Sequence, residues 1–492
     1  MLPRSLASNA VTVNVDRCTF YATTNECRDT GPLKVAIRML PDDVLLEIFI
    51  FYVDGAERIE AWYTLVHVCR RWRYVVFESP RRLNLRLLCT YSTPVRETLD
   101  AWPALPIIIR KSVDPTSLLA GADNILAALE HHNRVCHIDL WGVPSSLLER
   151  FATVTKEPFP ALTYLELWSN DESVPVLPDS FLGGSAPHLR TLYLIGIPFP
   201  ALPKLLLSTN DLVNLDLSDT PHSGYISPEA MVNCLTILIK LESLELGFRS
   251  PRSRPKTNQR PPPRKRAVLP ALTWFQFKGV SEYLEDFVSR IDAPLLHTIR
   301  VTMFNQLIFN ISQFPRFICR AEEFEAITEA VVVLYDQSVK VTLYPQTGKG
   351  DRAMLALAVS CSESDWQLSS LEQVCRSSLP LMFGLERLDI HEDKYWGPHW
   401  RDDMESTQWL ALFHPFIAVK DLYLSEQLAL RVAHALQELA RGRTTGVLPV
   451  LHNLFLEGLQ QSGSVREAIG KFVAARQLSD CPTVTVNRWE RR

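Results

Sequence analysis

The chain has 492 residues, of which 47% are hydrophobic and 22% charged, and its formal net charge is −4. This length exceeds what one ordinary core supports, so two or more domains are expected. No apolar stretch approaches the roughly 20 residues that a membrane helix needs, and no apolar secretory segment opens the chain. The charge also argues against nucleic acid as a partner. Composition therefore predicts a globular protein of several domains with no membrane partner.

The cysteines and catalytic motifs exclude several kinds of site. The ten cysteines are scattered without a C-x-x-C pair, so neither a disulfide framework nor a metal site is expected. This usage favours a reducing compartment, the cytoplasm, the nucleus or both. The chain has no G-x-S-x-G, H-E-x-x-H, P-loop or G-x-G-x-x-G pattern. We therefore expect no catalytic residues, no cofactor and no enzyme activity of its own.

Residues 1–36 are expected to form a partly disordered arm, and a set of short helices follows. Pro41 suits a first helical position, and Asp42 and Asp43 complement the positive end of a helix. Apolar residues then recur at three- and four-residue spacing, which predicts one apolar helix face formed by Val44, Leu45, Ile48, Phe49 and Tyr52. Two further helices are expected at residues 57–68 and 69–77. Three helices this short bury little surface, so they would gain stability by docking.

Three short motifs in this segment carry a family resemblance. They are Leu-Pro-Asp-Asp-Val-Leu-Leu-Glu-Ile-Phe at 40–49, Leu-Val-His-Val-Cys-Arg-Arg-Trp-Arg at 65–73 and Ser-Pro at 79–80. In this order they resemble the F-box, and residues 37–85 are identified as an F-box domain. One departure is that Arg81-Arg82-Leu83 stands where the family often has Leu-Trp, which weakens the last family contact.

The resemblance implies a partner and a contact surface. Members of this family bind the Skp adaptor of a cullin-based SCF ubiquitin ligase through the F-box. Carried over to this chain, the adaptor-binding residues are Leu40, Pro41, Leu45, Ile48, Phe49, Val68, Cys69, Trp72 and Pro80. A bland alternative is that the helices only cap the domain that follows.

A second pattern fills residues 86–490: apolar, two residues, apolar, one residue, apolar. Leu162/Leu165/Leu167 and Leu189/Leu192/Leu194 are two of ten such units, which start 23 to 34 residues apart except for one interval of 89. These are stretched leucine-rich-repeat periods, in which the last two apolar positions alternate as in a short strand. We expect an α/β repeat fold, an irregular leucine-rich solenoid of parallel strands with outer helices at residues 228–240 and 428–441. The whole arrangement resembles the large F-box families of mushroom-forming fungi.

The 89-residue interval is expected to hold two or three further units. Candidate strands lie at residues 330–334, 339–344 and 354–360, and a helix is expected at 368–377. Their register is left open.

Two segments between repeats stand out. Residues 249–266 are rich in arginine, lysine and proline without any acid, which predicts a disordered basic loop. The sharper alternative is a nuclear-import signal or a contact with a polyanion. Residues 391–403 carry Trp396 and Trp400 directly after a strand. They form either a self-packed loop or a binding hot spot on the rim.

The residue between the last two apolar positions of each unit should point away from the core. Five of these ten residues are acidic and one is basic, while aromatic residues gather toward the C-terminus. We expect a target protein with a basic, partly apolar surface. The expected target-binding residues are Glu166, Asp216, Glu245, Trp396, Trp400, Tyr423 and Phe455.

The leading hypothesis is a non-catalytic substrate receptor that binds the Skp adaptor and, through it, cullin, while its solenoid holds an unknown target. The alternative is an interaction scaffold without a ligase, and an enzyme is a distant third. The sequence does not identify the target.

Overall fold

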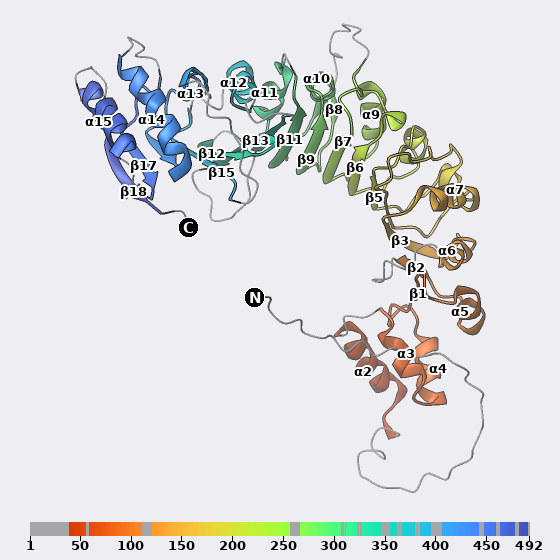
Figure 1. Cartoon of the computed structure of the whole chain (residues 1–492). Coiled ribbons are helices and arrows are strands. Elements are labelled where there is room, and N and C mark those ends of the chain that lie inside the picture. Colours follow the sequence, from red (N-terminus) through yellow and green to blue (C-terminus); the bar gives the residue numbers. More distant parts are fainter. Residues whose placement is uncertain are drawn as a thin grey trace. The chain divides into compact units, whose positions relative to one another are not determined.

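The computed structural model describes residues 39–55, 59–110, 121–255, 266–306, 309, 311–321, 324, 327–345, 355–361, 367–378, 384–394, 406–441, 447–458, 463–477 and 482–490. The chain divides into two compact units, Met1–Asn84 and Leu85–Arg492 (Figure 1). The expected arm at residues 1–36 lies outside the described residues. None of the helices in the described ranges has the length and apolar character needed to cross a membrane.

The N-terminal unit contains the three predicted helices, α2 (Asp42–Asp54), α3 (Ala61–Val66) and α4 (Arg70–Glu78). Pro41 precedes α2, and its carbonyl accepts the amide of Leu45 at 3.0 Å. The helices meet over a small aromatic core, in which the rings of Phe49 and Trp72 lie 4.7 Å apart. Trp62 is 1% exposed at its centre. Burying one aromatic side chain contributes about 1.5–3 kcal/mol, so a few residues hold this unit together.

The second unit is built on a sheet of sixteen strands (Figure 1). In spatial order they are β1 (Leu87–Cys89), β2 (Ile107–Arg110), β3 (Val135–Trp141), β4 (Tyr164–Trp168), β5 (Thr191–Ile195), β6 (Asn214–Thr220), β7 (Ser243–Phe248), β9 (Trp274–Gly279), β11 (Thr298–Phe304), β14 (Leu355–Ser360), β13 (Ser338–Pro345), β12 (Ile327–Tyr335), β15 (Arg387–Glu392), β16 (Asp421–Leu424), β17 (Asn453–Glu457) and β18 (Thr485–Trp489). A separate parallel pair joins β8 (Ala267–Val268) to β10 (Ile291–Asp292).

Helices cover one face of this sheet (Figure 1). They are α5 (Val95–Ala101), α6 (Ala122–Leu129), α7 (Ser145–Val154), α8 (Leu202–Leu206), α9 (Pro228–Leu235), α10 (Ser281–Arg290), α11 (Gln313–Ile318), α12 (Gln367–Ser378), α13 (Ser406–Phe413), α14 (Glu426–Arg441) and α15 (Gly463–Gln477), with short 3-10 turns η2 (Phe181–Gly184) and η3 (His222–Gly224). The helix expected at 228–240 is shorter than predicted. The helix expected at 428–441 is present as α14.

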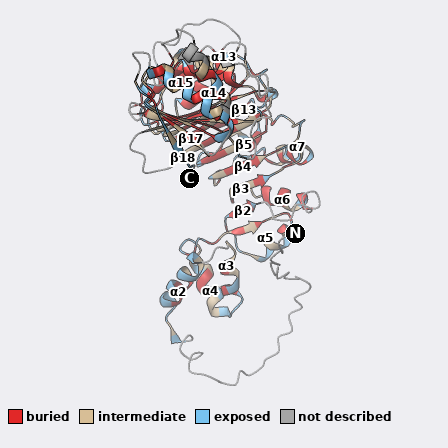
Figure 2. Ribbon diagram, turned by 60° about the vertical axis from the view of Figure 1, so that its left-hand side comes forward, coloured by how far each residue is buried: buried red, intermediate tan, exposed pale blue. Residues whose placement is uncertain are grey.

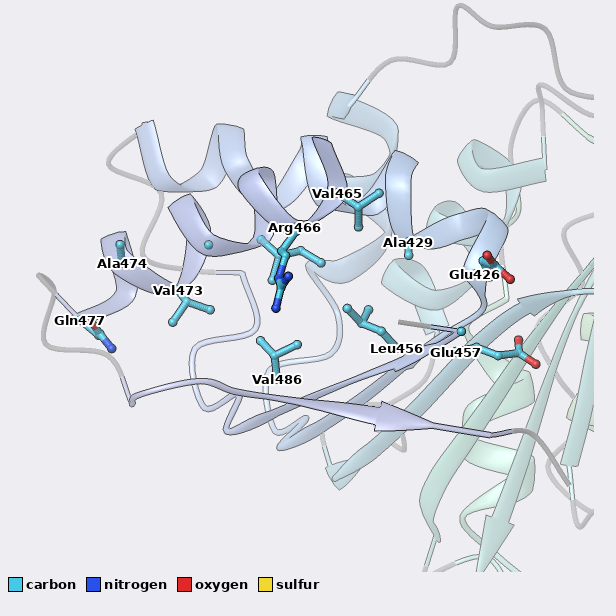
Figure 3. Close-up of a pocket in the computed structure, with 13 residues that line it drawn as sticks. Glu426, Ala429, Leu456, Glu457, Val465, Arg466, Val473, Ala474, Gln477 and Val486 are labelled. Carbon is cyan, nitrogen blue, oxygen red and sulfur yellow. The ribbon is translucent and has the colours of Figure 1, made fainter. Parts of the chain in front are cut away.

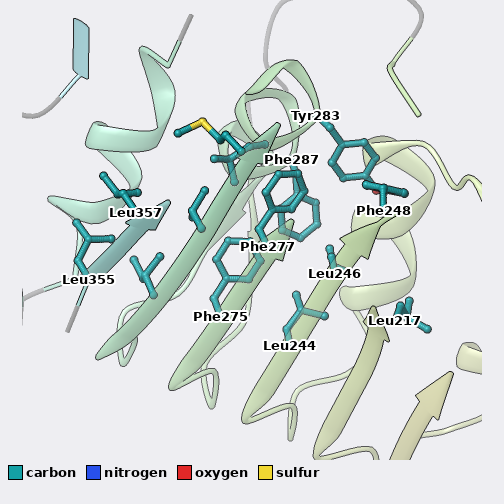
Figure 4. Close-up of a cluster of buried hydrophobic side chains, with 14 of the residues drawn as sticks. Leu217, Leu244, Leu246, Phe248, Phe275, Phe277, Tyr283, Phe287, Leu355 and Leu357 are labelled. Carbon is teal, nitrogen blue, oxygen red and sulfur yellow. The ribbon is translucent and has the colours of Figure 1, made fainter. Parts of the chain in front are cut away.

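The hydrophobic core lies between the sheet and its helices. Alternate side chains of each strand point to opposite faces, so the paired leucines of each repeat all enter this layer. Leu165 and Leu167 of β4 are fully buried and stand in register with the matching leucines of β5. Farther along, Phe275 and Phe277 enlarge the core, and Phe275 stacks on Phe287 of α10 at 5.8 Å (Figure 4). Buried residues accordingly follow the strands (Figure 2).

The 89-residue interval departs from the expected repeat. The three predicted strands are present as β12, β13 and β14, and the predicted helix is α12. However, β13 runs antiparallel to both of its neighbours. Only residues 336 and 337 join the paired ends of β12 and β13. A parallel pair needs a crossover of a dozen or more residues, so this connection forces a hairpin. The register that the sequence left open is thus that of an antiparallel insert, and the general expectation of parallel strands does not hold for β13.

The predicted disordered loop at 249–266 also needs correction. Its first part is ordered, because Ser253 is 1% exposed and the Arg249 guanidinium donates to the carbonyl of Asp171 at 2.9 Å. At the far end, Arg266 donates to the carbonyl of Ser289 at 3.2 Å. Residues 256–265 lie outside the described residues. A deletion meant to spare the fold should therefore be restricted to this inner stretch.

Candidate functional site

One face of α2 presents large apolar side chains to solvent. Val44, Ile48, Phe51 and Tyr52 recur at helical spacing and are all exposed, Phe51 by 83%. The opposite face of the helix, which includes Leu45, Leu46 and Phe49, is buried in the unit's own core. The five residues predicted to form one apolar face are thus divided between two faces. One set holds the fold together, and the other is available for a partner.

The nine predicted adaptor-binding residues are divided in the same way. Pro41, Ile48, Val68 and Cys69 are exposed, while Leu40, Trp72 and Pro80 are half-buried. Leu45 and Phe49 are each only 1% exposed. These two support the helices from inside, so a surface contact by their side chains is not available in this structure.

Part of this surface is formed by residues that were not predicted to bind the adaptor. Met39, Phe51 and Tyr74 are among its most exposed apolar side chains, at 78%, 83% and 62%. The signal for Phe51 was present in the sequence, since it lies three residues after Ile48 and therefore on the same side of the helix. We call the exposed set the apolar surface of the module: Met39, Val44, Ile48, Phe51, Tyr52, Val68 and Tyr74.

Polar contacts fix the start of α2. The Arg71 guanidinium donates to the Asp42 carboxylate at 2.8 Å and also to the backbone carbonyl of Leu40. A second ion pair joins Glu47 to Arg82. These contacts tie α2 to the third helix and to the turn after it. The turn that carries Leu40 and Pro41 is thereby fixed to the third helix through Arg71.

On the second unit, the face of the sheet opposite the helices carries one continuous row of side chains. All ten residues predicted to point away from the core fall in this row, which confirms the predicted alignment. The strand register places them in the order Arg110, Asp139, Glu166, Tyr193, Asp216, Glu245, Gln276, Arg300, Ala356, Thr342, Val331, Asp389, Tyr423, Phe455 and Asn487.

The first half of the row is acidic, and four carboxylates occupy five successive strands. We call Asp139, Glu166, Asp216 and Glu245 the acidic row. Burial and then the neighbouring Asp216 raise the pKa of Glu245 to about 7. Burial also raises the pKa of Glu166 and that of Asp216. A cation placed against these crowded carboxylates would stabilise their ionised form.

Neighbouring polar groups orient these carboxylates. The Tyr164 hydroxyl donates to Glu166, and the Gln276 amide donates to Glu245. Asp139, at the edge of the row, accepts from Arg110 at 3.1 Å. Glu166, Asp216 and Glu245 form no ion pair with the described part of the chain. The centre of the row therefore holds oriented negative groups without a partner cation of their own.

The far end of the row is aromatic. Tyr423 and Phe455 stack with ring centroids 4.2 Å apart, and Trp489 meets Tyr423 edge-on at 5.2 Å. The guanidinium carbon of Arg387, on the neighbouring strand β15, lies over the ring of Tyr423 at 4.2 Å from its centroid. Between this aromatic end and the acidic row stand Gln276, Arg300, the three uncharged residues Ala356, Thr342 and Val331 of β14, β13 and β12, and Asp389. Trp396 and Trp400, which were predicted to join it, lie outside the described residues.

Metal-ligating residues do not gather on this face: within the described ranges, no group of three or more His, Cys, Asp or Glu side chains is placed to hold a metal ion. His137 stacks on Tyr164 at 4.2 Å beside the acidic row. Burial, and then the charge of Arg110, lower the pKa of His137 to about 4, so its ring is neutral at physiological pH. It contributes a flat surface and no charge.

Comparisons with known proteins leave the chain without an assigned family. No protein-family profile matches it, and no curated protein is similar to it in sequence. Among solved structures it is similar to the leucine-rich repeat-containing protein LegL7 from Legionella pneumophila, with 12% sequence identity and a TM-score of 0.28. That likeness covers 76% of this chain and 99% of LegL7.

Proposed function

We propose that this chain is the substrate receptor of an SCF-type cullin ubiquitin ligase. Its N-terminal module would bind the Skp adaptor, and through it cullin, while the sheet of the second unit would bind the protein to be ubiquitinated. The observation that carries the proposal is the exposed apolar surface of the module. It includes Ile48 of the first motif and Val68 of the Val-Cys-x-x-Trp motif that resemble the F-box, and Met39 directly precedes the Leu-Pro pair.

The energetics favour a partner for this surface. Fully burying an aliphatic or aromatic side chain contributes about 1.5–3 kcal/mol, and the module exposes seven such residues. Contiguous exposed apolar patches on small units usually mark interaction sites. Ile48 and Phe51 lie near the middle of the α2 stripe, so we assign them as the central anchors, with Val68 at the start of the third helix.

The acidic row is the surface that we assign to the target. A basic segment laid across β3 to β7 would bring cations to Glu166, Asp216 and Glu245, and the aromatic end could hold apolar residues of the same target. Electrostatic complementarity of this kind speeds association and selects among partners. Because burial raises the pKa of Glu245 to about 7, capture should weaken as the pH falls through that value.

The receptor would need no chemistry of its own. It would raise the effective concentration of the target near a ubiquitin-charged subunit. The cytoplasm, the nucleus or both are the proposed locations, and no cofactor is proposed.

A double variant of the full-length chain, Leu40→Ala with Pro41→Ala, tests the proposal. The carbonyl of residue 40 still accepts from Arg71, because that contact uses only the backbone. Immunoprecipitation followed by mass spectrometry, with the proteasome inhibited, should show loss of the Skp adaptor and cullin while other partners remain. Leu207→Ala, at an exposed leucine of the second unit, is the matched control and should keep both. If the wild-type chain brings down no adaptor, the ligase role is wrong and an interaction scaffold takes its place.

A further inference from the structure

The last strand of the sheet leaves a cavity beneath the last helix. The cavity, of about 450 Å³, lies between α14, α15, β17 and β18 (Figure 3). Its walls are mainly apolar, and Leu456, Ile469 and Val486 are among the residues that line them. Ligand sites typically measure roughly 300–1,000 Å³, so this volume is large enough for side chains of a partner.

The sequence of β18 explains why the cavity exists. In β17, the two side chains directed toward the helices are Leu454 and Leu456, which are 0% and 4% exposed. Their register partners on β18 are Val486 and Arg488. Val486 is smaller than leucine and remains 39% exposed, while Arg488 reaches out to Glu490 at 2.9 Å. The layer of buried apolar side chains that lies between the earlier strands and their helices therefore stops one strand before the sheet does.

The outer edge of β18 also has no described strand paired with it. The amide of Thr485 donates to the carbonyl of His452 on the β17 side at 2.8 Å. In a parallel ladder, alternate residues direct their backbone groups to opposite neighbours, so Val486 and Arg488 direct theirs to the free edge. Such an edge is a template for a further strand. An opening lined by apolar groups and a free edge lie together at this end of the sheet.

We infer that this end binds an extended segment of a partner protein. The segment adds a strand beside β18 and inserts apolar side chains, spaced two residues apart, beneath α15. This is the mode of strand addition, in which main-chain hydrogen bonds supply affinity and pockets for alternate side chains supply selectivity. The charged residues of the lining are Glu426, Glu457 and Arg466. Arg466 is exposed and forms no ion pair with any described residue, so an acidic residue of the segment is favoured beside Arg466 and opposed beside either glutamate. The inference needs neither the apolar surface of the module nor the acidic row.

A fluorescent peptide with the sequence of residues 449–458 is a suitable probe. It carries Leu454 and Leu456 at alternate positions and ends near Glu457, so it imitates a strand that already fits this sheet. Titrated with the full-length chain and followed by fluorescence anisotropy, it should bind saturably, and a scrambled peptide should not. Absence of saturable binding below about 200 µM would overturn the inference.

Two matched pairs of variants locate the contact. Arg488→Pro removes an edge-facing amide and leaves the bonds to β17, whereas Arg488→Ala keeps the amide. Gly470→Trp fills the cavity from α15, where an added Cβ meets open space, and Gly470→Ala adds only a methyl group. The proline and tryptophan variants should weaken binding at least about tenfold, and the alanine variants less than about threefold.

The outcomes separate the alternatives. If Arg488→Pro lowers the melting temperature, Gly470→Trp still carries the test, because its site is open. Undiminished binding by a folded Gly470→Trp variant would overturn insertion into the cavity. Concentration-dependent dimers that Arg488→Pro abolishes, without peptide binding, would assign the edge to a second copy of this chain and overturn the partner segment.

Discussion

The two units of this chain treat apolar side chains in opposite ways. Among the described residues, fifteen large apolar side chains are exposed, and seven of them lie between Met39 and Tyr74. The other eight are scattered over the much longer second unit, whose strand leucines in the repeated units are buried between sheet and helices. The second unit carries carboxylates and stacked rings along the row opposite its helices, where they are partly buried and Glu166 is only 8% exposed. The module is thus suited to a partner that buries apolar surface, and the sheet to one that brings positive charge.

The largest expected effect is the loss of stability when a core side chain of the module is removed. Phe49→Ala removes a side chain that is 1% exposed and packs on Trp72 at 4.7 Å. Its loss should cost about 3–5 kcal/mol, enough to unfold so small a unit. Phe51→Ala, two residues away and 83% exposed, should change the stability by less than about 0.5 kcal/mol. Hydrogen exchange of α2 and α3 measures both, and equal protection in the two variants would contradict the two-faced description of α2.

The next effect concerns the acidic row. Glu166→Gln, Asp216→Asn and Glu245→Gln together remove the charge while keeping shape and hydrogen-bond acceptors. Affinity for a lysine-rich probe peptide should fall by about tenfold, roughly 1.4 kcal/mol, and its salt dependence should flatten. Isothermal titration at two salt concentrations measures this. A matched triple variant at Glu97, Glu149 and Glu229, on helices α5, α7 and α9, should leave binding unchanged.

A smaller effect appears in stability. Because burial raises the pKa of Glu245 from 4.5 to about 7, the folded chain holds this proton more tightly than the unfolded chain does. The resulting stabilisation is complete below pH 4.5 and is lost as the pH rises through about 7. The full shift corresponds to roughly 3 kcal/mol, and solvent screening of this partly exposed group reduces it to about 1–2 kcal/mol.

Glu245→Gln should therefore stabilise the second unit at about pH 8 and have little effect at about pH 4.5. Urea unfolding at the two pH values gives the comparison. A gain in stability that is equal at both would show that the substitution acts through packing and that the carboxylate is not strained by its surroundings.

The smallest effect tests the polar clamp on α2. Asp42 and Arg71 have side chains that are 55% and 37% exposed, so their ion pair should be weak. Arg71→Ala should destabilise the module by at most about 1 kcal/mol. Thermal unfolding followed through α2 measures the change. A loss comparable to that of Phe49→Ala would mean that the contact to the Leu40 carbonyl holds the module together.

The sequence predicted the helices and strands better than it predicted strand direction and which helix face is buried. The three helices and the repeated strands follow from periodicity, since spacing of 3.6 or 2 identifies which side chains share a face. Periodicity does not give the direction of a strand, and Asp336-Gln337 lacks the glycine or asparagine signature of a tight hairpin. The strand β13 was therefore predicted, but its antiparallel direction was not. Nor could it decide which apolar face of α2 is buried, because both Phe49 and Phe51 fit a stripe. Tertiary packing alone decides that.

The exposed face of α2 is the surface that we propose binds the Skp adaptor. Direct titration of purified adaptor into the full-length chain and into a folded Ile48→Ser variant tests it. We expect wild-type binding at or below about 1 µM with one adaptor per chain, and a loss of at least about thirtyfold in the variant, close to 2 kcal/mol. Ser substitution of Leu207 serves as the control. Wild-type protein that binds no adaptor at about 10 µM, or an Ile48→Ser variant that binds as well as wild type, would contradict the claim.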